Sequence, residues 1–180
     1  FLKENLFNLA LGLSRHPKLV FMDNDIDFSD PEWLDRTSSM LDEHDVIQPF
    51  ESCRWMDETG ARCTLEKTNC VKPILEKEPK NGDKQHSGFA WAFRRDFLDS
   101  IGGFYDLFPI GGGDSALWQC LMSEEDSEKM RSWNKGGAFL ADTNTFKEYE
   151  KRVRSQNPRM NYLKDVVVHH RWHGTYEDRQ

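Results

Sequence analysis

Apolar residues recur at helical spacing at the start of the chain. Between residues 2 and 14 they return every three or four positions, which predicts an amphipathic helix. The next apolar run, 18–22, is short and leads into an acidic cluster, which indicates a buried strand. Asp30 and Pro31 suit the N-cap and the first position of a second helix, expected over 30–44.

The remaining segments alternate between helical and strand patterns. Residues 45–51 predict a strand near a sheet edge, because Pro49 cannot donate a ladder hydrogen bond. Residues 59–86 show little periodicity and predict a long loop. We further expect strands over 88–94 and 166–168, helices over 95–101, 114–121 and 142–154, and a charged helix or loop over 123–135. This order predicts one α/β domain over residues 1–180, without an internal repeat.

Composition narrows the classes of protein that fit. The 180 residues carry a net charge of −7, which excludes nucleic-acid binding through bulk positive charge. No apolar run is long enough for a membrane span, and no signal peptide is recognised. The chain begins within a helical pattern and without Met, so we interpret it as a piece of a longer protein. Its localisation stays open between the Golgi lumen and the cytoplasm.

The four cysteines do not form a zinc-binding pattern. Cys53, Cys63, Cys70 and Cys120 contain no C-x-x-C pair. Free thiols are the first interpretation, because a chain of this length needs no covalent staple. A Cys63–Cys70 or Cys53–Cys70 disulfide that ties down the 59–86 loop is the alternative.

Two acids follow the first predicted strand, where open α/β sheets bind ligands. Asp23 and Asp25 flank Asn24 in one tight turn, and such carboxylates repel each other unless a cation lies between them. Oxygen ligands of this kind favour Mg²⁺, Ca²⁺ or Mn²⁺. The alternative is an Asx turn that leads into the next helix.

Three histidines cluster after the last predicted strand. Neighbouring residues of a strand face opposite ways, so His169 and His170 cannot both face one site. After the turn at Gly174, His173 can approach the site of one of them, and imidazoles together with a carboxylate suit Mn²⁺. A surface cluster, or packing around Trp172, is the alternative.

A glycine run precedes another acid. Gly111, Gly112 and Gly113 allow a close backbone approach to a ligand, and Asp114 then opens a helix. Asp114 is either a helix N-cap or an acid–base group. The spacing matches neither the Walker loop nor G-x-G-x-x-G.

Taken in order, these segments resemble the GT-A glycosyltransferases, particularly the β-1,4-galactosyltransferase-like branch. Phe1, Lys3 and Asn8 are similar to the family's F-x-R-x4-N helix, with Lys3 in place of Arg. The turn 23–25 resembles its DxD metal motif. Residues 111–114 resemble its G-G-E-D motif, in which the last Asp is the catalytic base.

Two further segments extend this resemblance. Residues 86–104 resemble the part that closes on donor sugar and acceptor, and His170 and His173 resemble the remaining metal ligands. Three departures stand out, the first being that Ser115 and Ala116 replace further acids of the family. Gly113 replaces the motif Glu that usually holds the acceptor sugar, and the family's first nucleotide-binding strands would precede Phe1.

The resemblance implies a GT-A-like mixed sheet flanked by helices, N-terminally incomplete, and a site with three parts. Asp114 would be the catalytic base. The donor, a nucleotide-diphosphate sugar with UDP favoured, would be bound by Phe1, Lys3, Asn8, Asp23, Trp91, Gly112 and Gly113. A divalent metal, Mn²⁺ first and Mg²⁺ second, would be held by Asp23, Asp25, His170 and His173.

The implied function is metal-dependent transfer of a sugar to a hydroxyl of a glycan or other acceptor, with inversion. Trp91 and Trp172 either stack on sugar faces or pack in the core. Two alternatives stay open. The first is a metal-dependent hydrolase built from the same acids and histidines. The second is a non-catalytic sugar- or partner-binding remnant of such a transferase.

Overall fold

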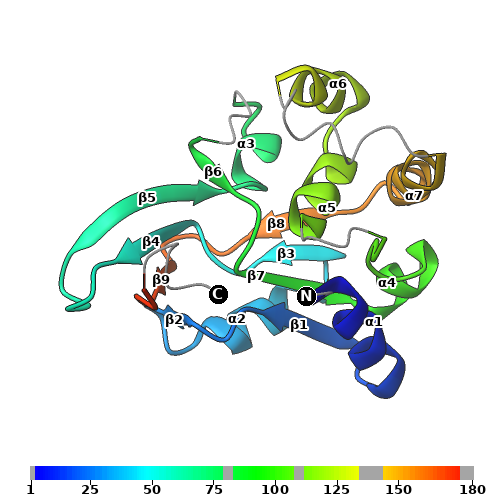
Figure 1. Ribbon diagram of the computed structural model, residues 1–180. Coiled ribbons are helices and arrows are strands. Elements are labelled where there is room, and N and C mark those ends of the chain that lie inside the picture. Colours follow the sequence, from blue (N-terminus) through cyan, green and yellow to red (C-terminus); the bar gives the residue numbers. More distant parts are fainter. Residues whose placement is uncertain (1–2, 79–82, 108–111, 134–143, 175–180) are drawn as a thin grey trace.

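The computed structural model describes residues 3–78, 83–107, 112–133 and 144–174. This part of the chain is a mixed α/β protein with two mixed sheets and seven helices (Figure 1). Among these helices, none is both long enough and apolar enough to cross a membrane.

Helices and strands alternate along most of the chain. The helices are α1 (Lys3–Leu13), α2 (Trp33–Met40), α3 (Lys72–Leu75), α4 (Arg95–Ile101), α5 (Gly113–Leu121), α6 (Glu124–Trp133) and α7 (Asn144–Ser155). The strands are β1 (Lys18–Met22), β2 (Ile26–Phe28), β3 (Val46–Gln48), β4 (Ser52–Met56), β5 (Cys63–Asn69), β6 (Gln85–His86), β7 (Ala90–Arg94), β8 (Met160–Tyr162) and β9 (Val167–His170).

The first sheet has the order β1-β7-β3-β8 and forms the centre of the protein. Its two inner strands, β7 and β3, are almost wholly buried, which explains why both are mostly apolar, with Gln48 as a buried polar residue at the end of β3. Aromatic rings pack between this sheet and the helices α1 and α4; they belong to Phe7, Phe21, Phe93, Phe97 and Phe104. Helices α4 to α7 gather beside this sheet (Figure 1).

The second sheet has the order β2-β9-β4-β5-β6. Its hairpin, β4 and β5, extends away from the body of the protein (Figure 1). Strand β9 alternates between more exposed and buried positions, so Val168 and His170 share the buried face and His169 lies on the other. The two histidines therefore face opposite ways, as the sequence predicted.

Helix α1 packs through a different face from the one with most leucines. Leu6, Leu9 and Leu13 are between 51% and 84% exposed, whereas Leu11 is buried and Phe7 packs against the core. The ring of Phe7 lies 5.0 Å from that of Phe21 and 5.4 Å from that of Phe104, centre to centre. Aromatic contact therefore decides the orientation of the helix, because it buries large areas at one point.

The predicted loop over 59–86 is wrong. This segment contains β5, α3 and β6, and β5 alone has seven residues. Strand β5 is largely exposed and polar, so it lacks the apolar alternation on which strand prediction depends. Its partners define it instead, because β4 pairs with it antiparallel and β6 pairs with it in parallel.

Several other predictions differ from the structure in the bounds of an element, in its place in the sheet, or in the number of strands. Helix α2 begins at Trp33, with Glu32 as its N-cap; Asp30 accepts a hydrogen bond from the Glu32 N–H and pairs with Arg36. Pro49 follows β3, which is an inner strand and not an edge strand. The short strands β2, β4 and β8 were not predicted, because pairing rather than local pattern defines them.

All four cysteines are free thiols, so the first interpretation is confirmed and neither proposed disulfide forms. Cys63 is exposed, and the other three are buried. Burial raises the pKa of the Cys53 thiol to about 12, so this side chain behaves as a small apolar group of the core.

A buried glutamine ties three segments of the fold together. Gln48 is fully buried at the end of β3. Its Nε2 donates to the carbonyl of His86 at 3.2 Å, and its Oε1 accepts the N–H of Cys70 at 2.9 Å and of Val71 at 3.3 Å. One side chain therefore fixes β6 and the start of α3 against the first sheet.

Replacement of this side chain should destabilise the fold. Gln48→Ala leaves buried backbone groups without partners and opens a cavity, so we expect a loss of about 3 kcal/mol in the free energy of unfolding. Urea denaturation measures it. Gln156→Ala, at an exposed position, serves as the control and should change stability by less than about 0.5 kcal/mol. Equal stability of the two variants would contradict this role.

Candidate active site

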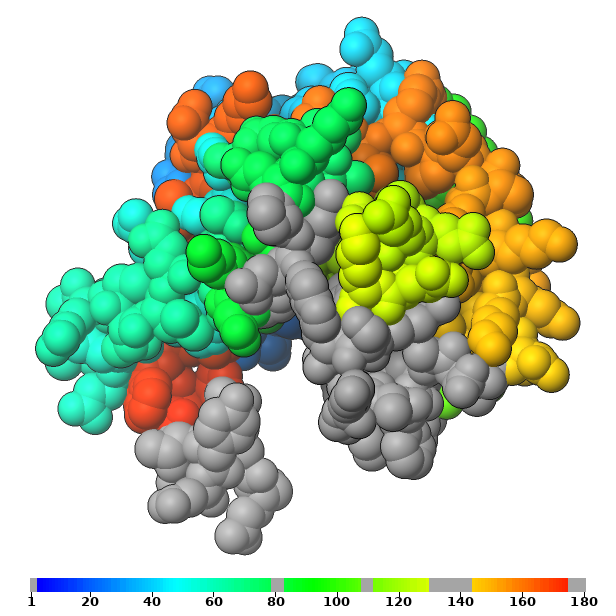
Figure 2. Space-filling view, turned by 90° about the horizontal axis from the view of Figure 1, so that it is seen from above, coloured from blue at the N-terminus to red at the C-terminus, as the bar shows by residue number. Residues whose placement is uncertain are grey.

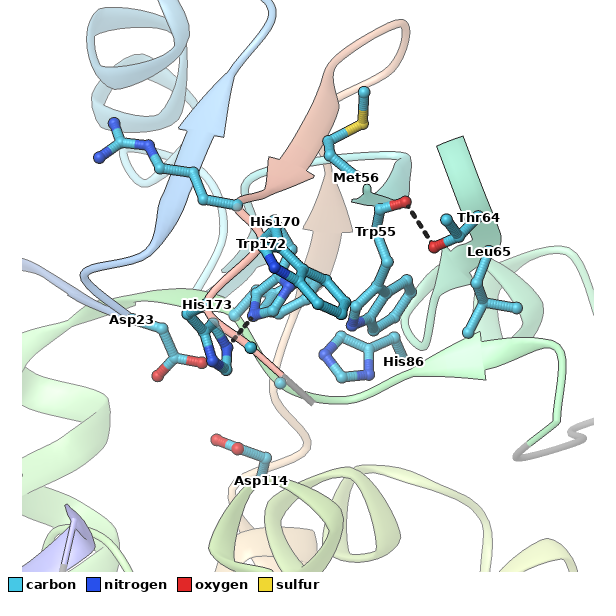
Figure 3. A pocket seen from close by; sticks show the side chains of 14 residues that line it. Asp23, Trp55, Met56, Thr64, Leu65, His86, Asp114, His170, Trp172 and His173 are labelled. Atoms are coloured by element: carbon cyan, nitrogen blue, oxygen red, sulfur yellow. Dashed lines mark hydrogen bonds between the residues drawn. The ribbon is translucent and has the colours of Figure 1, made fainter. Parts of the chain in front are cut away.

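One pocket of about 600 Å³ lies where the two sheets meet. Its walls come from the end of β1, the β4–β5 hairpin, β6, the start of β7, the start of α5 and the segment after β9 (Figure 3). The volume lies in the range of small-molecule sites. Asp23, Asp114, His170 and His173, which the sequence singled out, all line it.

Strand pairing brings one acid and two histidines together. Because β2 runs antiparallel to β9, Ile26 lies opposite His170, and the preceding Asp25 reaches the same place. The Nε2 atoms of His170 and His173 each lie 3.3 Å from Asp25 Oδ2 and 3.1 Å from each other. The turn after β9 thus returns His173 to His170, as predicted.

These three side chains suit a metal ion. Among the described residues they form the one group of three ligand atoms that all lie within 4.8 Å of one another. Asp25 Oδ1 is buried and has no hydrogen-bond partner among the described residues, so a second oxygen of the same carboxylate has no other role there. Two imidazoles and one carboxylate can occupy one face of a divalent ion and leave its other positions to a ligand.

Asp23 is placed differently from Asp25. It does not belong to this group of three, and its Oδ1 lies 3.6 Å from Lys3 Nζ. Lys3 Nζ also donates to Asp114 Oδ2 at 2.7 Å. The ammonium group of Lys3 therefore lies between Asp23 of the acidic turn and Asp114 in the first turn of α5.

The surroundings of Asp114 change the pKa of its carboxyl group. Burial raises its pKa above the ordinary value, and the nearby Lys3 ammonium counteracts only part of this rise. Burial alone would lower the pKa of Lys3, but the Asp114 carboxylate outweighs it and the pKa of Lys3 is raised. The pair thus holds a charged amine beside a carboxylate with increased affinity for a proton.

Asp114 is not the N-cap of its helix. Gly112 occupies that position with a φ of +99°, which favours glycine, and no side chain caps the helix. Gly113 lies against α1, where an added Cβ would collide with the carboxyl of Glu4. The first turn of α5 therefore packs closely on α1, and Asp114 points towards Lys3 instead of its own backbone.

Two other predicted donor residues, Asn8 and Trp91, have structural partners within the chain. The side-chain amide of Asn8 bonds to the backbone of Phe104. Its oxygen accepts the Phe104 N–H at 2.8 Å, and its nitrogen donates to the Phe104 carbonyl at 2.9 Å. Trp91 is buried, and its Nε1 donates to the Ser87 carbonyl at 2.7 Å, so of the two roles considered for it, it has the one of packing in the core. Phe1 lies outside the described residues.

An aromatic group at the floor of the pocket was not among the individually predicted site residues. The ring of Phe89 lies between those of His86 and His170, 4.2 Å and 5.1 Å away, and Trp55 contacts the same cluster. Phe89 has a φ of +73°, which is uncommon for a residue with a side chain. The sequence predicted no element between the strand 45–51 and the loop 59–86. Trp55 lies in this gap, so no local pattern identified it.

His86 is an uncharged imidazole at neutral pH. Burial, with help from the nearby Lys67, lowers its pKa to about 4. Its Nε2 is buried, and no described residue forms a hydrogen bond with it. Gln48 donates a hydrogen bond to the carbonyl of His86, and this bond fixes the backbone from which the His86 ring extends.

Comparison with known proteins adds no family. Neither a scan of the chain against protein-family models nor a search of curated proteins found a match.

The grouping of Asp25, His170 and His173 gives a direct prediction. Calorimetric titration of Mn²⁺ should show binding that Asp25→Ala weakens by at least about 100-fold, because loss of a ligand exceeds the 10–100-fold cost of outer-shell changes. Asp27→Ala is the matched control, since Asp27 lies in the same segment but pairs with Arg171. An Mn²⁺ affinity that Asp25→Ala leaves unchanged would exclude this metal site.

Proposed function

We propose that the chain is a metal-dependent glycosyltransferase of the GT-A type, which transfers a sugar from a nucleotide diphosphate to an acceptor hydroxyl. One observation carries the proposal. A carboxyl group with raised pKa, Asp114, faces the same pocket as a set of two imidazoles, with a carboxylate beside them. A proton acceptor and a cation site in one cavity are the groups that this transfer requires.

The acidic site explains why a cation is required. Asp23, Asp25 and Asp114 would repel the diphosphate of the donor, and Lys3 offsets part of this charge. A divalent ion held by Asp25, His170 and His173 would supply Lewis-acid stabilisation of the leaving diphosphate. Lys3 adds a second positive charge on the side towards α5.

The transfer step balances with Asp114 as general base. The acceptor hydroxyl gives its proton to an Asp114 carboxylate oxygen as its own oxygen forms a bond to the anomeric carbon. The bond from that carbon to the phosphate oxygen breaks, and its electron pair leaves with the nucleotide diphosphate. Attack opposite the leaving group inverts the anomeric configuration. Lys3, bonded to Asp114 Oδ2, keeps the carboxylate oriented during this step.

One feature bears on the acid that is missing from the motif. Gly113 lacks the acid that the family motif has at this position, but the carboxyl of Glu4 lies against Gly113 from α1. Glu4 is almost fully buried, and its Oε1 has no hydrogen-bond partner within the described part of the chain. Two acids therefore lie at the first turn of α5: Asp114 belongs to α5 itself, and Glu4 belongs to α1.

Substitution of the base tests the proposal. Asp114→Asn should reduce sugar transfer by about 10²–10⁴-fold, because the amide cannot accept the acceptor proton. Binding of Mn²⁺ and UDP should persist, and UDP should strengthen Mn²⁺ binding in both proteins. The measurements are product formation with a panel of UDP-sugars and hydroxyl acceptors, and calorimetric titration.

Asp96→Asn provides the matched control, since Asp96 is a first-turn acid of another helix, away from the pocket. It should leave transfer unchanged. Normal turnover by Asp114→Asn would overturn the role of Asp114. Release of sugar without an acceptor would favour the hydrolase, and absence of both Mn²⁺ and UDP binding would favour a binding remnant.

A further inference from the structure

The pocket has two chemically different sides. Asp23, Asp114, His170 and His173 line one side, and Lys3 contacts both of these acids. The other side is formed by the β4–β5 hairpin and by Trp172 after β9, and it is largely apolar; its side chains are Trp55, Met56, Thr64, Leu65 and Trp172. We call these five side chains the hairpin wall. In Figure 2 the hairpin lies at the margin of the molecule, next to the end of the described C-terminal segment.

The hairpin wall presents flat apolar surface to the pocket. Leu65 is 46% exposed and Trp172 is 47% exposed, although both are large apolar side chains. The ring of Trp55 is supported from below by His86 and Phe89, at 4.9 Å and 5.1 Å between ring centres. Exposed apolar groups gathered in one cavity, on supported rings, are typical of a surface that a ligand covers.

A polar group lies at the foot of this wall. Figure 3 shows the His86 ring beneath Trp55, on the side facing Asp114. A Cβ added to Gly88 would lie 2.9 Å from His86 Nε2 and 3.4 Å from Asp114 Oδ2, so both atoms border the space beside Gly88. Because His86 Nε2 is buried without a partner among the described residues, a ligand hydroxyl in this space would satisfy it.

We infer that the hairpin wall is the acceptor subsite, that it stacks on the apolar C–H face of a pyranose, and that His86 binds the acceptor hydroxyl beside Asp114. This inference rests on the proposed function. A pyranose ring fits because one face of it offers C–H groups to aromatic rings while its edge carries hydroxyls. The uncharged state of His86 allows its imidazole to donate or accept, and the absence of a side chain at Gly88 leaves room for the hydroxyl.

Ligand binding tests the subsite without relying on turnover. The probes are the methyl β-pyranosides of glucose, galactose, mannose and N-acetylglucosamine, titrated in the presence of Mn²⁺ and UDP and followed by saturation-transfer NMR. We expect Trp55→Ala and His86→Phe each to weaken the bound pyranoside by about tenfold. Trp55→Phe should retain most of the affinity, because it preserves an aromatic face.

Two further variants separate the subsite from general damage. Gly88→Ala should abolish pyranoside binding by filling the point between His86 and Asp114, and its φ lies outside the range that excludes a side chain. Leu34→Ala, on exposed α2 and outside the pocket, is the control for loss of an apolar side chain. Calorimetry with Mn²⁺ should give wild-type affinity in all of these variants.

The outcomes for the subsite and for the proposed function are distinct. Pyranoside binding that depends on Trp55 and His86, in a protein that binds neither Mn²⁺ nor UDP, would support the sugar subsite and overturn the transferase. Binding of Mn²⁺ and UDP without any pyranoside binding would overturn the subsite. Pyranoside binding that Trp55→Ala, His86→Phe and Gly88→Ala leave unchanged would also overturn it.

Discussion

The pairing of β2 with β9 joins the acidic turn near the start of the chain to the histidines near its end. Ile26 lies opposite His170 in this pairing, so Asp25 is carried to the imidazole by backbone hydrogen bonds. On the other side of β9, the parallel strand β4 places Trp55 opposite His170. Three neighbouring strands thus set a carboxylate, an imidazole and an indole in a row, and every part of the pocket is positioned relative to this row.

A strained residue connects this row to the first sheet. Phe89 precedes β7, and its φ of +73° is sparsely populated for residues other than glycine. Its carbonyl accepts the N–H of Asp23 at 2.8 Å, and the next residue, Ala90, pairs with Met22 of β1. These bonds hold the backbone in a conformation that directs the Phe89 ring between His86 and His170. The floor of the pocket and the acidic turn are therefore fixed by the same contacts.

Local pattern was sufficient for much of the fold. The first helix, the strand 18–22, the buried strand ending at Arg94 and the helix after it followed from apolar spacing, because each buries a face of its own. The hairpin and the short strands β2 and β8 did not follow. Their residues are polar or few, and long-range pairing supplies the stability that local propensity lacks. Helix α1 is a related case. Its leucines at helical spacing, Leu6, Leu9 and Leu13, are exposed, because aromatic packing of Phe7 determines which face of the helix is buried.

The sequence by itself determined which chemical groups are available: the acids of the 23–25 turn, Asp114 after its glycines, and the histidines after the last strand. It also determined that His169 and His170 face opposite ways, because side chains alternate along any strand. Only the tertiary structure decided that Asp25 joins the two histidines while Asp23 faces Lys3, and that Trp55 and His86 complete the pocket. The reason is physical: distances between side chains depend on strand register and sheet order, and pairings between distant segments set both.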